Sequence, residues 1–390
     1  MKMKVLYTIK RPIIFLRNIY KIAKISSKNY IFIISDVIKL NKQKGLTTEE
    51  YFQFEFERRD KDFRDSFLGL NEQRYYLDYL NPKKYYILAR NKYLTHKVLN
   101  NTGVRKSELY CYYHPEGKVL HSSEIANNLE GIVRILKSKE IDQCVIKTTE
   151  SSSGANVLVV KKISYSDNNC ILTLFDGTVK KMSDFISDTP LIFESLIAQT
   201  EQLSSLNPSS VNTIRFMTTL YPSGESKVIA AFIKIGRDGK CVDNAGKGGN
   251  VDACIDINTG KILYTIQFDG WRRIKNITHH PDNGNLIEGI KIEGWEKIKD
   301  QVNKFQESFP FIKAAGWDIA VTDEGPVVIE VNDMWDRTGQ YFIRRGWRNE
   351  IRDCYFAWKK TGVKYNSGRL NNNFSVIKMN KIINKDNSNK

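Results

Sequence analysis

Long apolar runs are missing from this 390-residue chain. No stretch approaches the roughly eighteen consecutive apolar residues that a membrane-spanning helix needs. The apolar residues 13–16 near the N-terminus are too few for the core of a signal peptide. We therefore expect a cytoplasmic protein, with peripheral association with the inner face of the membrane as an open alternative.

Paired cysteines and internal repeats are also missing. The chain has six cysteines but no CxxC motif, and none stands at metal-ligand spacing from a histidine. This pattern predicts reduced, mostly buried thiols rather than disulfides or a cysteine-bound metal. The adjacent pair His279 and His280 precedes a proline, and the sequence assigns it no role.

Positive charge is abundant, but it lies at the two ends of the chain. The net charge is +16. Residues 1–48 carry eleven Lys and Arg against the single Asp36, and residues 359–390 carry eight against Asp386. These two segments sum to +17, which leaves the rest of the chain near −1. A near-neutral body without a nucleic-acid motif argues against a nucleic-acid partner.

An amphipathic pattern runs from Pro12 to about Lys24, and Pro12 suits the first turn of a helix that begins there. Apolar residues form one helical stripe with cations beside it; the stripe holds Ile13, Leu16, Ile19, Tyr20 and Ala23, and the cations are Arg17, Lys21 and Lys24. Weak adsorption to an anionic membrane surface and ordinary packing on the body both fit this pattern. A cap pattern at Thr47 or Thr48 before Glu50 predicts a further helix.

Two strand-like runs flank Asp323, Glu324 and Gly325 within residues 315–336 and predict a hairpin with a three-residue loop. This register places Asp318 opposite Glu330. Alternation along the strands then projects Asp318, Glu330 and Asn332 from one face, and Ile319, Ile329 and Val331 from the other. Such oxygen ligands suit Mg2+, whereas the alternative is a surface hairpin whose acids face solvent.

Other candidate residues lie on elements before this hairpin. A helix from Asn91 to Gly103 carries Lys92 at its start, and a second hairpin over about 145–162 carries Lys147 on its first strand. The small-residue tip of that hairpin could wrap an anion, whereas the alternative is a plain flexible hairpin tip. Arg215 lies on a strand facing away from its apolar neighbours, as a surface residue or as a cation in a cleft. A glycine-rich loop follows and contains Asp243, Asn244, Gly248 and Gly249.

Taken in order, these segments resemble the ATP-grasp superfamily over roughly residues 90–340. The resemblance is carried by Lys92, VIKTTESSSGANV, FESL, VNTIRFMTT, VDNAGKGG and GWDIAVTDEGPVVIEVN. More narrowly, the chain is similar to the sugar-transfer associated ATP-grasp proteins, which are related to alpha-L-glutamate ligases. The resemblance implies an α+β ATP-grasp fold, in which two α+β subdomains grip ATP between antiparallel sheets. We expect a mostly helical N-terminal part over 1–88, the ATP-grasp domain over 89–362, and an Asn/Lys-rich flexible tail over 363–390.

The resemblance also implies roles for the candidate residues. ATP would be bound by Lys92, Lys147, Ser153, Gly154, Glu194, Ser195, Leu196 and Arg215. Catalysis would rest on Lys147 and Arg215, one or two Mg2+ ions (or Mn2+ as a substitute) would be bound by Asp318, Glu330 and Asn332, and the acceptor would lie near Asp243, Asn244, Gly248 and Gly249.

The implied activity is that of an ADP-forming carboxylate–amine ligase that makes an amide through an acylphosphate. The family context indicates surface polysaccharide biosynthesis, for example the joining of an amino acid to a uronic acid or nucleotide sugar. Two alternatives stay open: a kinase that phosphorylates a hydroxyl, and a nucleotide-binding scaffold of a glycan-assembly complex. The sequence identifies neither the two substrates nor the oligomeric state.

Overall fold

The computed structural model describes residues 2–116, 123–150, 157–166, 169–241, 249–268, 274–363 and 379–383, and their side chains from residue 13 onward. The chain divides into two compact units. The first comprises mainly residues 1–83 and 336–390, and the second comprises 84–268 and 275–335. The C-terminal helices therefore group with the N-terminal helices, whereas the sequence suggested that they belong with residues 89–362.

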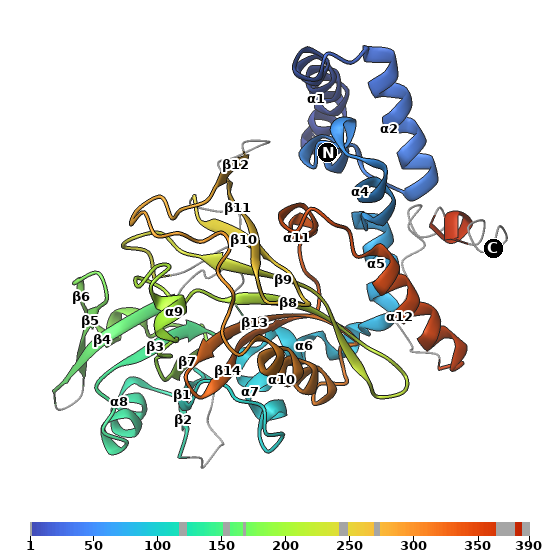
Figure 1. The fold of residues 1–390 in the computed structure, drawn as a ribbon. Coiled ribbons are helices and arrows are strands. Elements are labelled where there is room, and N and C mark those ends of the chain that lie inside the picture. Colours follow the sequence, from blue (N-terminus) through green and yellow to red (C-terminus); the bar gives the residue numbers. More distant parts are fainter. Residues whose placement is uncertain are drawn as a thin grey trace. The chain divides into compact units, whose positions relative to one another are not determined.

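The first unit is helical (Figure 1). Its helices are α1 (Lys2–Ser26), α2 (Tyr30–Lys44), α3 (Thr48–Gln53), α4 (Lys61–Ser66), α5 (Leu70–Leu80), α11 (Thr338–Phe342) and α12 (Arg348–Lys360), with the short 3-10 helix η1 (Phe56–Arg58). The predicted start at Pro12 was wrong, because α1 begins at Lys2 and continues through the proline. A proline inside a helix removes one backbone hydrogen bond but does not always end the helix. The expected cap is present, since Thr47 and Glu50 form a capping box at the start of α3.

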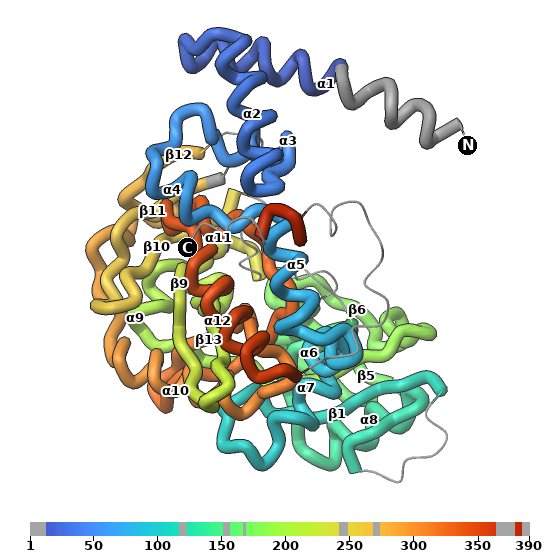
Figure 2. The backbone as a smooth tube through the Cα atoms, turned by 90° about the vertical axis from the view of Figure 1, so that its right-hand side faces the viewer, coloured from blue at the N-terminus to red at the C-terminus, as the bar shows by residue number. Residues whose placement is uncertain are grey.

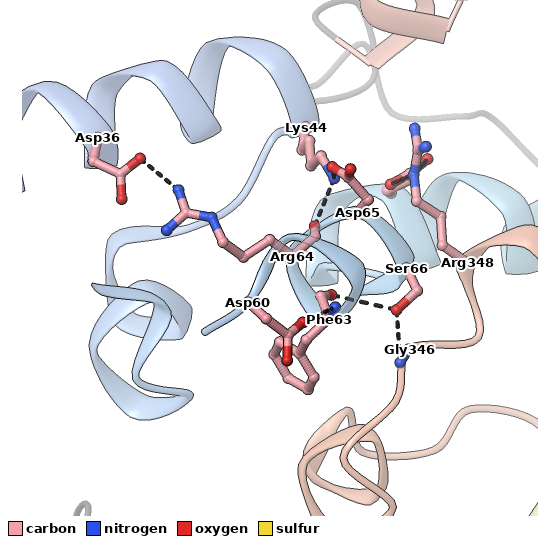
Figure 3. A network of polar contacts seen from close by, with 10 residues as sticks. Asp36, Lys44, Asp60, Phe63, Arg64, Asp65, Ser66, Gly346 and Arg348 are labelled. Carbon is pink, nitrogen blue, oxygen red and sulfur yellow. Dashed lines mark hydrogen bonds and ion pairs between the residues drawn. The ribbon is translucent and has the colours of Figure 1, made fainter. Parts of the chain in front are cut away.

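Polar contacts connect distant parts of the chain within this unit (Figure 3). Helices α5 and α12 lie side by side (Figure 2). The buried Glu72 of α5 accepts hydrogen bonds from Arg348 of α12 at 2.8 and 2.9 Å. The backbone N–H of Gly346 donates to Ser66 Oγ at 3.0 Å. Within the predicted tail, residues 379–383 are helical and bury Met379 and Ile383.

The second unit contains two seven-stranded sheets. The first has the order β2-β1-β7-β3-β4-β5-β6 and the second the order β12-β11-β10-β9-β8-β13-β14. The strands of the first sheet are β1 (Leu109–Tyr113), β2 (Ile125–Ala126), β3 (Cys144–Thr148), β4 (Val157–Tyr165), β5 (Cys170–Leu174), β6 (Val179–Lys181) and β7 (Leu191–Glu194). Those of the second are β8 (Ile214–Leu220), β9 (Ser226–Ile235), β10 (Val251–Ile255), β11 (Ile262–Phe268), β12 (Ile274–Ile277), β13 (Ala314–Thr322) and β14 (Gly325–Asn332).

Helices cover one face of each sheet. The helices of this unit are α6 (Tyr86–Arg90), α7 (Lys92–Leu99), α8 (Leu129–Ser138), α9 (Glu201–Ser204) and α10 (Trp295–Glu307), with the short 3-10 helices η2 (Lys83–Tyr85) and η3 (Met182–Phe185). Helix α8 buries Ile132 and Leu136 in the core of the first sheet. Helix α10 packs on the second sheet, where the rings of Trp295 and Phe216 stack with centroids 5.4 Å apart. The burial of such rings is a main source of stability for these layers.

Both predicted hairpins are confirmed, with one correction at the C-terminal hairpin. They are the antiparallel pairs β3–β4 and β13–β14, and β8–β9 and β10–β11 form further antiparallel pairs. The loop between β13 and β14 has two residues rather than three, because Gly325 pairs with Thr322. A bulge then shifts the register, since Ile319 pairs with Val328 but Asp318 pairs with Glu330. The expected pairing of Asp318 with Glu330 is therefore correct, whereas the placement of Ile329 on the core face was wrong.

The bulge decides which side chains of β14 face the core. Val328 and Val331 both pack in the core of the second sheet, although an odd number of positions separates them. In a regular strand, residues an odd number of positions apart point to opposite faces, so the unpaired Ile329 restores the alternation. If β14 were regular and Ile329 were paired, Glu330 would share a face with Val328. The bulge thus allows Glu330 and Asn332 to lie on the polar face.

Two other expectations can be compared with the structure. All six cysteines are free, and all but Cys241 are buried. Among the described residues, no helix combines the length and the apolar character that a membrane span requires.

The buried pair of Glu72 and Arg348 gives a test of the first unit. Arg348→Met should lower the free energy of unfolding by about 3–5 kcal/mol, because it leaves the carboxylate of Glu72 buried without its cation. The matched control is Arg345→Met, since Arg345 pairs with Glu350 at a half-exposed position. Chemical denaturation should find a loss below about 1 kcal/mol for this control. Equal losses in the two variants would contradict the prediction.

Candidate active site

One face of the second sheet is apolar and the other carries charged side chains at its centre. The apolar face includes Ile214, Phe216, Ile233 and Trp317, all fully buried in the core. Strand alternation sends the neighbouring residues to the opposite face. The residues that gather there are Arg215 on β8, Lys234 on β9, Asp252 on β10, Asp318 on β13, and Glu330 and Asn332 on β14.

Asp318 is the centre of this group. It is 4% exposed, and the guanidinium of Arg215 donates two hydrogen bonds to its carboxylate at 2.6 and 2.7 Å. The ammonium of Lys234 lies 3.0 Å from the same carboxylate. Although burial disfavours ionisation, these two cations hold the pKa of Asp318 well below its usual range. Asp318 is therefore ionised at neutral pH.

Glu330 lies across the hairpin from Asp318 and has a different environment. Burial and the neighbouring Asp318 carboxylate raise the pKa of Glu330, and Lys92 opposes this shift. Asn332 donates its amide N–H to the carbonyl of Gly316 at 3.3 Å, which leaves the side-chain oxygen as an acceptor. Two carboxylates and an amide oxygen therefore lie on adjacent strands.

This set of oxygen donors fits a hard divalent cation. Mg2+ prefers carboxylate and amide oxygens, and it is commonly bound by only one or two carboxylates together with phosphate oxygens. A cation would also reduce the repulsion between Asp318 and Glu330, which raises the pKa of Glu330. Within the described part of the chain, no three His, Cys, Asp or Glu side chains form a metal site by themselves.

A second charged cluster belongs to the first sheet. Glu194 is the last residue of β7 and is 3% exposed. Its carboxylate forms an ion pair with the ammonium of Lys147 on β3, at 2.6 Å. Its other oxygen contacts His96 of α7. Although burial disfavours ionisation, Lys147 and His96 hold the pKa of Glu194 well below its usual range. Glu194 thus fixes the position of Lys147 on the strand.

Lys92 connects the two clusters. It begins α7, and its backbone N–H donates to the carbonyl of Thr149 just beyond β3 at 2.9 Å. Burial lowers the pKa of Lys92, Glu330 raises it, and Lys147 lowers it further. A small cavity of about 20 Å³ is lined by Lys92, Glu194 and Glu330 among others. Residues from both sheets therefore meet at one place in the second unit.

Of the ten candidate residues that the structure describes, it brings seven together. Lys92, Lys147, Glu194, Arg215, Asp318, Glu330 and Asn332 lie in the two adjoining clusters. Ser195 is bound to Glu108 through its backbone N–H and its hydroxyl, both at 2.9 Å, and Leu196 is 37% exposed. Gly249 accepts hydrogen bonds from Arg237 and Gln267. Ser153, Gly154, Asp243, Asn244 and Gly248 lie outside the described residues.

The sequence analysis did not single out several charged residues in or near these clusters. Lys234 is the only charged residue in the apolar run of β9 after Lys227, and a lone charge in such a run is a signal for a buried partner. His96 follows Lys92 by four positions and so shares a helix face with it. Arg90 makes a bidentate contact with Asp333 at 2.8 Å, and no sequence pattern relates these two residues.

His280 is buried, and its ring lies 2.9 Å from the carbonyl of Gly236, which is a structural contact.

Comparison with protein families decides the assignment. The profile described as "Sugar-transfer associated ATP-grasp" matches residues 71–353, which is well over half of the chain. The chain belongs to the sugar-transfer associated ATP-grasp family. Its α+β architecture of two sheets is accordingly an ATP-grasp fold, as the sequence predicted. No curated protein matches this member of the family.

Solved structures that resemble this ATP-grasp chain are distant. The chain is 11% identical to N5-carboxyaminoimidazole ribonucleotide synthetase from Thermotoga maritima, with a TM-score of 0.38 and coverage of 71% of this chain and 52% of that one. It is 14% identical to D-alanine–D-alanine ligase from Bacillus anthracis, with a TM-score of 0.36 and coverage of 71% and 70%. For biotin carboxylase from Campylobacter jejuni, the identity is 9%, the TM-score 0.39, and the coverage 71% and 48%. The chain thus spans about half the length of the first and third of these proteins.

The Glu194 cluster gives a test that depends on pH. Glu194→Gln should lower the free energy of unfolding by about 3–5 kcal/mol at neutral pH, because Lys147 would lose its buried carboxylate partner. The folded-state pKa of Glu194 is depressed, so its contribution is present above the usual carboxyl pKa and is lost as pH falls through the folded value. The difference between wild type and variant should therefore shrink on acidification.

The matched control is Glu124→Gln, since Glu124 pairs with Lys97 at a half-exposed position. This exposed pair should contribute less than about 1 kcal/mol. Urea unfolding at several pH values measures both variants. If the Glu194→Gln variant were as stable as the wild type at neutral pH, the ion pair would not stabilise the fold.

Proposed function

We propose that this ATP-grasp protein is an ADP-forming carboxylate–amine ligase that acts in surface polysaccharide biosynthesis. The observation that carries the proposal is the pair of adjoining clusters, in which Lys92, Lys147, Arg215 and Lys234 accompany the carboxylates of Asp318 and Glu330. Several cations beside a set of oxygen ligands suit a polyphosphate with its metal ion.

The charges of the site suit phosphoryl transfer. This reaction demands mainly positioning and neutralisation of the charge on phosphate oxygens. Lys147 is fixed by Glu194, and Lys92 adjoins it at the start of α7, so both would bind phosphate oxygens of ATP. Arg215 and Lys234 are oriented by Asp318 and would contact the transferred phosphoryl group from the second sheet.

Asp318, Glu330 and Asn332 would hold Mg2+, which would supply charge neutralisation to the phosphates. Their oxygen donors and the unfavourable proximity of the two carboxylates support this assignment. Glu330 would have to be deprotonated to act as a ligand.

The reaction that we propose has two steps. An oxygen of the carboxylate substrate attacks the terminal phosphorus of ATP, the bond to the bridging oxygen breaks, and ADP leaves. The amine then attacks the acyl carbon of the acylphosphate, the bond from this carbon to the phosphate oxygen breaks, and the amine loses a proton. In this proposal the carboxylate is a sugar acid or nucleotide sugar and the amine is an amino acid; the family description supports only the link to sugar transfer.

The reaction products distinguish the ligase from its alternatives. Purified protein would be incubated with Mg2+, ATP and a panel of uronic acids, nucleotide uronates and amino acids, with hydroxylamine replacing the amine in parallel samples. For the ligase we expect ADP, free phosphate and an amide, and a hydroxamate where hydroxylamine is present. A stable phosphorylated acceptor without hydroxamate would overturn the ligase in favour of a kinase, and nucleotide binding without turnover across the panel would favour a scaffold.

The metal ligands give a sharper prediction. Glu330→Gln and Asn332→Ala should each lower turnover by at least about 100-fold, because an intended ligand is lost. The melting temperature of metal-free Glu330→Gln should equal or exceed that of the wild type, because the change removes a carboxylate that the fold disfavours.

Glu324→Gln is the matched control for this pair of variants. Glu324 lies in the turn of the same hairpin, and its side chain is 77% exposed. This variant should keep wild-type turnover and the same dependence on Mg2+ concentration. If Glu330→Gln remained active at limiting Mg2+, the ligand assignment would be incorrect.

A further inference from the structure

Helices α1 and α2 expose an unusual number of large apolar side chains. Ile13, Leu16 and Tyr20 of α1 are 62%, 60% and 57% exposed, and Ile31 and Ile38 of α2 are 74% and 47% exposed. The other faces of both helices are buried, with Ile19 and Ile22 of α1 and Ile33 and Val37 of α2 nearly inaccessible. Each helix therefore has a packed face and a second apolar face that meets solvent.

The exposed apolar side chains of the two helices meet at Tyr20 and Tyr30. The rings of these tyrosines stack with their centroids 6.5 Å apart, although both remain about half exposed. Lys28, between the helices, lies with its ammonium 4.7 Å from the ring centre of Phe32. Single exposed apolar residues are common on proteins, whereas several on two helices that contact each other favour an interaction surface.

All exposed charge on these two helices has one sign. Arg17, Lys24, Lys39 and Lys42 are exposed. The single carboxylate of residues 1–48 is Asp36, which is 7% exposed and bound to Arg64 and Tyr51. A surface with cations, exposed aliphatic residues and tyrosines, and with no exposed acid, is complementary to an anionic lipid leaflet. A second copy of this surface would instead bring like charges together.

We propose that the exposed face of α1 and α2, defined by Ile13, Leu16, Tyr20, Ile31 and Ile38 with the surrounding cations, docks the protein reversibly onto an anionic membrane surface. The apolar side chains enter the boundary between headgroups and acyl chains, and the cations attract the acidic headgroups. Docking does not require any residue of the candidate active site. A failure of the proposed ligase activity would thus leave this proposal intact.

Point variants test the proposal better than removal of α1. Deleting this helix would also remove Ile19, Ile22 and Ala23, which are buried, and would damage the first unit. The full chain would be mixed with vesicles of equimolar phosphatidylglycerol and phosphatidylcholine, or of phosphatidylcholine alone, and sedimented at low and high salt. We expect sedimentation only with the anionic vesicles, and release at high salt because salt screens the attraction.

The double variant Leu16→Ser/Ile31→Ser should weaken binding to the anionic vesicles by at least about tenfold, because it removes apolar side chains that would be inserted. Lys24→Gln/Lys39→Gln should weaken it by about fivefold for each cation removed. The matched controls lie in the second unit. They are Val179→Ser/Leu286→Ser, at positions 63% and 52% exposed, and Lys297→Gln/Lys304→Gln, at exposed positions of α10.

Thermal unfolding would verify that each variant remains folded. Three results would overturn the proposal: no sedimentation of the wild type with anionic vesicles at low salt, equal sedimentation with neutral vesicles, or equal losses in the controls and the α1–α2 variants. Light scattering without lipid would measure the oligomeric state and gives a fourth result that would overturn the proposal. If the wild type were a dimer that Leu16→Ser/Ile31→Ser converts to a monomer without changing vesicle binding, the face would serve self-association instead.

Discussion

The ionised carboxylate of Asp318 organises the polar face of the second sheet. It is buried on β13, where an unpaired charge would be costly, and it is compensated by Arg215 from the adjacent strand β8 and Lys234 from β9, the next strand beyond. These contacts hold two cationic side chains in defined positions. Glu330 differs, because burial and the carboxylate of Asp318 raise its pKa. The metal ion that we propose would relieve this repulsion, and the oriented cations would bind the proposed polyphosphate.

The two charged clusters of the second unit are built in the same way. In each, a buried carboxylate fixes the cations that surround it: Glu194 holds Lys147, and Asp318 holds Arg215 and Lys234. Buried charges of this kind stabilise a fold only when every group is paired, so their geometry is more defined than that of surface ion pairs. A positively charged site whose cations are already oriented requires little rearrangement when a phosphate group arrives.

Much of the strand arrangement could be predicted from the sequence, because alternation of apolar and polar residues is a local property. The hairpins, the face of Arg215 and the pairing of Asp318 with Glu330 follow from it. The pairing of Lys147 with Glu194 and of Arg90 with Asp333 could not be predicted from pattern, since strand order decides which distant residues become neighbours. The predicted start of α1 was wrong, because a proline weakens a helix without always ending it. The predicted three-residue turn of the C-terminal hairpin was wrong, because a two-residue turn followed by a bulge gives the same pairing of Asp318 with Glu330.

That compensation constrains how the hairpin could change in evolution or in design. The two-residue turn and the unpaired Ile329 each shift the register by one position, and only together do they keep Glu330 opposite Asp318. If β14 paired regularly from the same two-residue turn, Ile329 would lie opposite Asp318, Val331 would meet the charged cluster and Glu330 the apolar core. Deletion of Ile329 would instead leave Val328 opposite Ile319 and Glu330 opposite Asp318. The bulge is therefore the position at which β14 can lose a residue without exchanging its two faces.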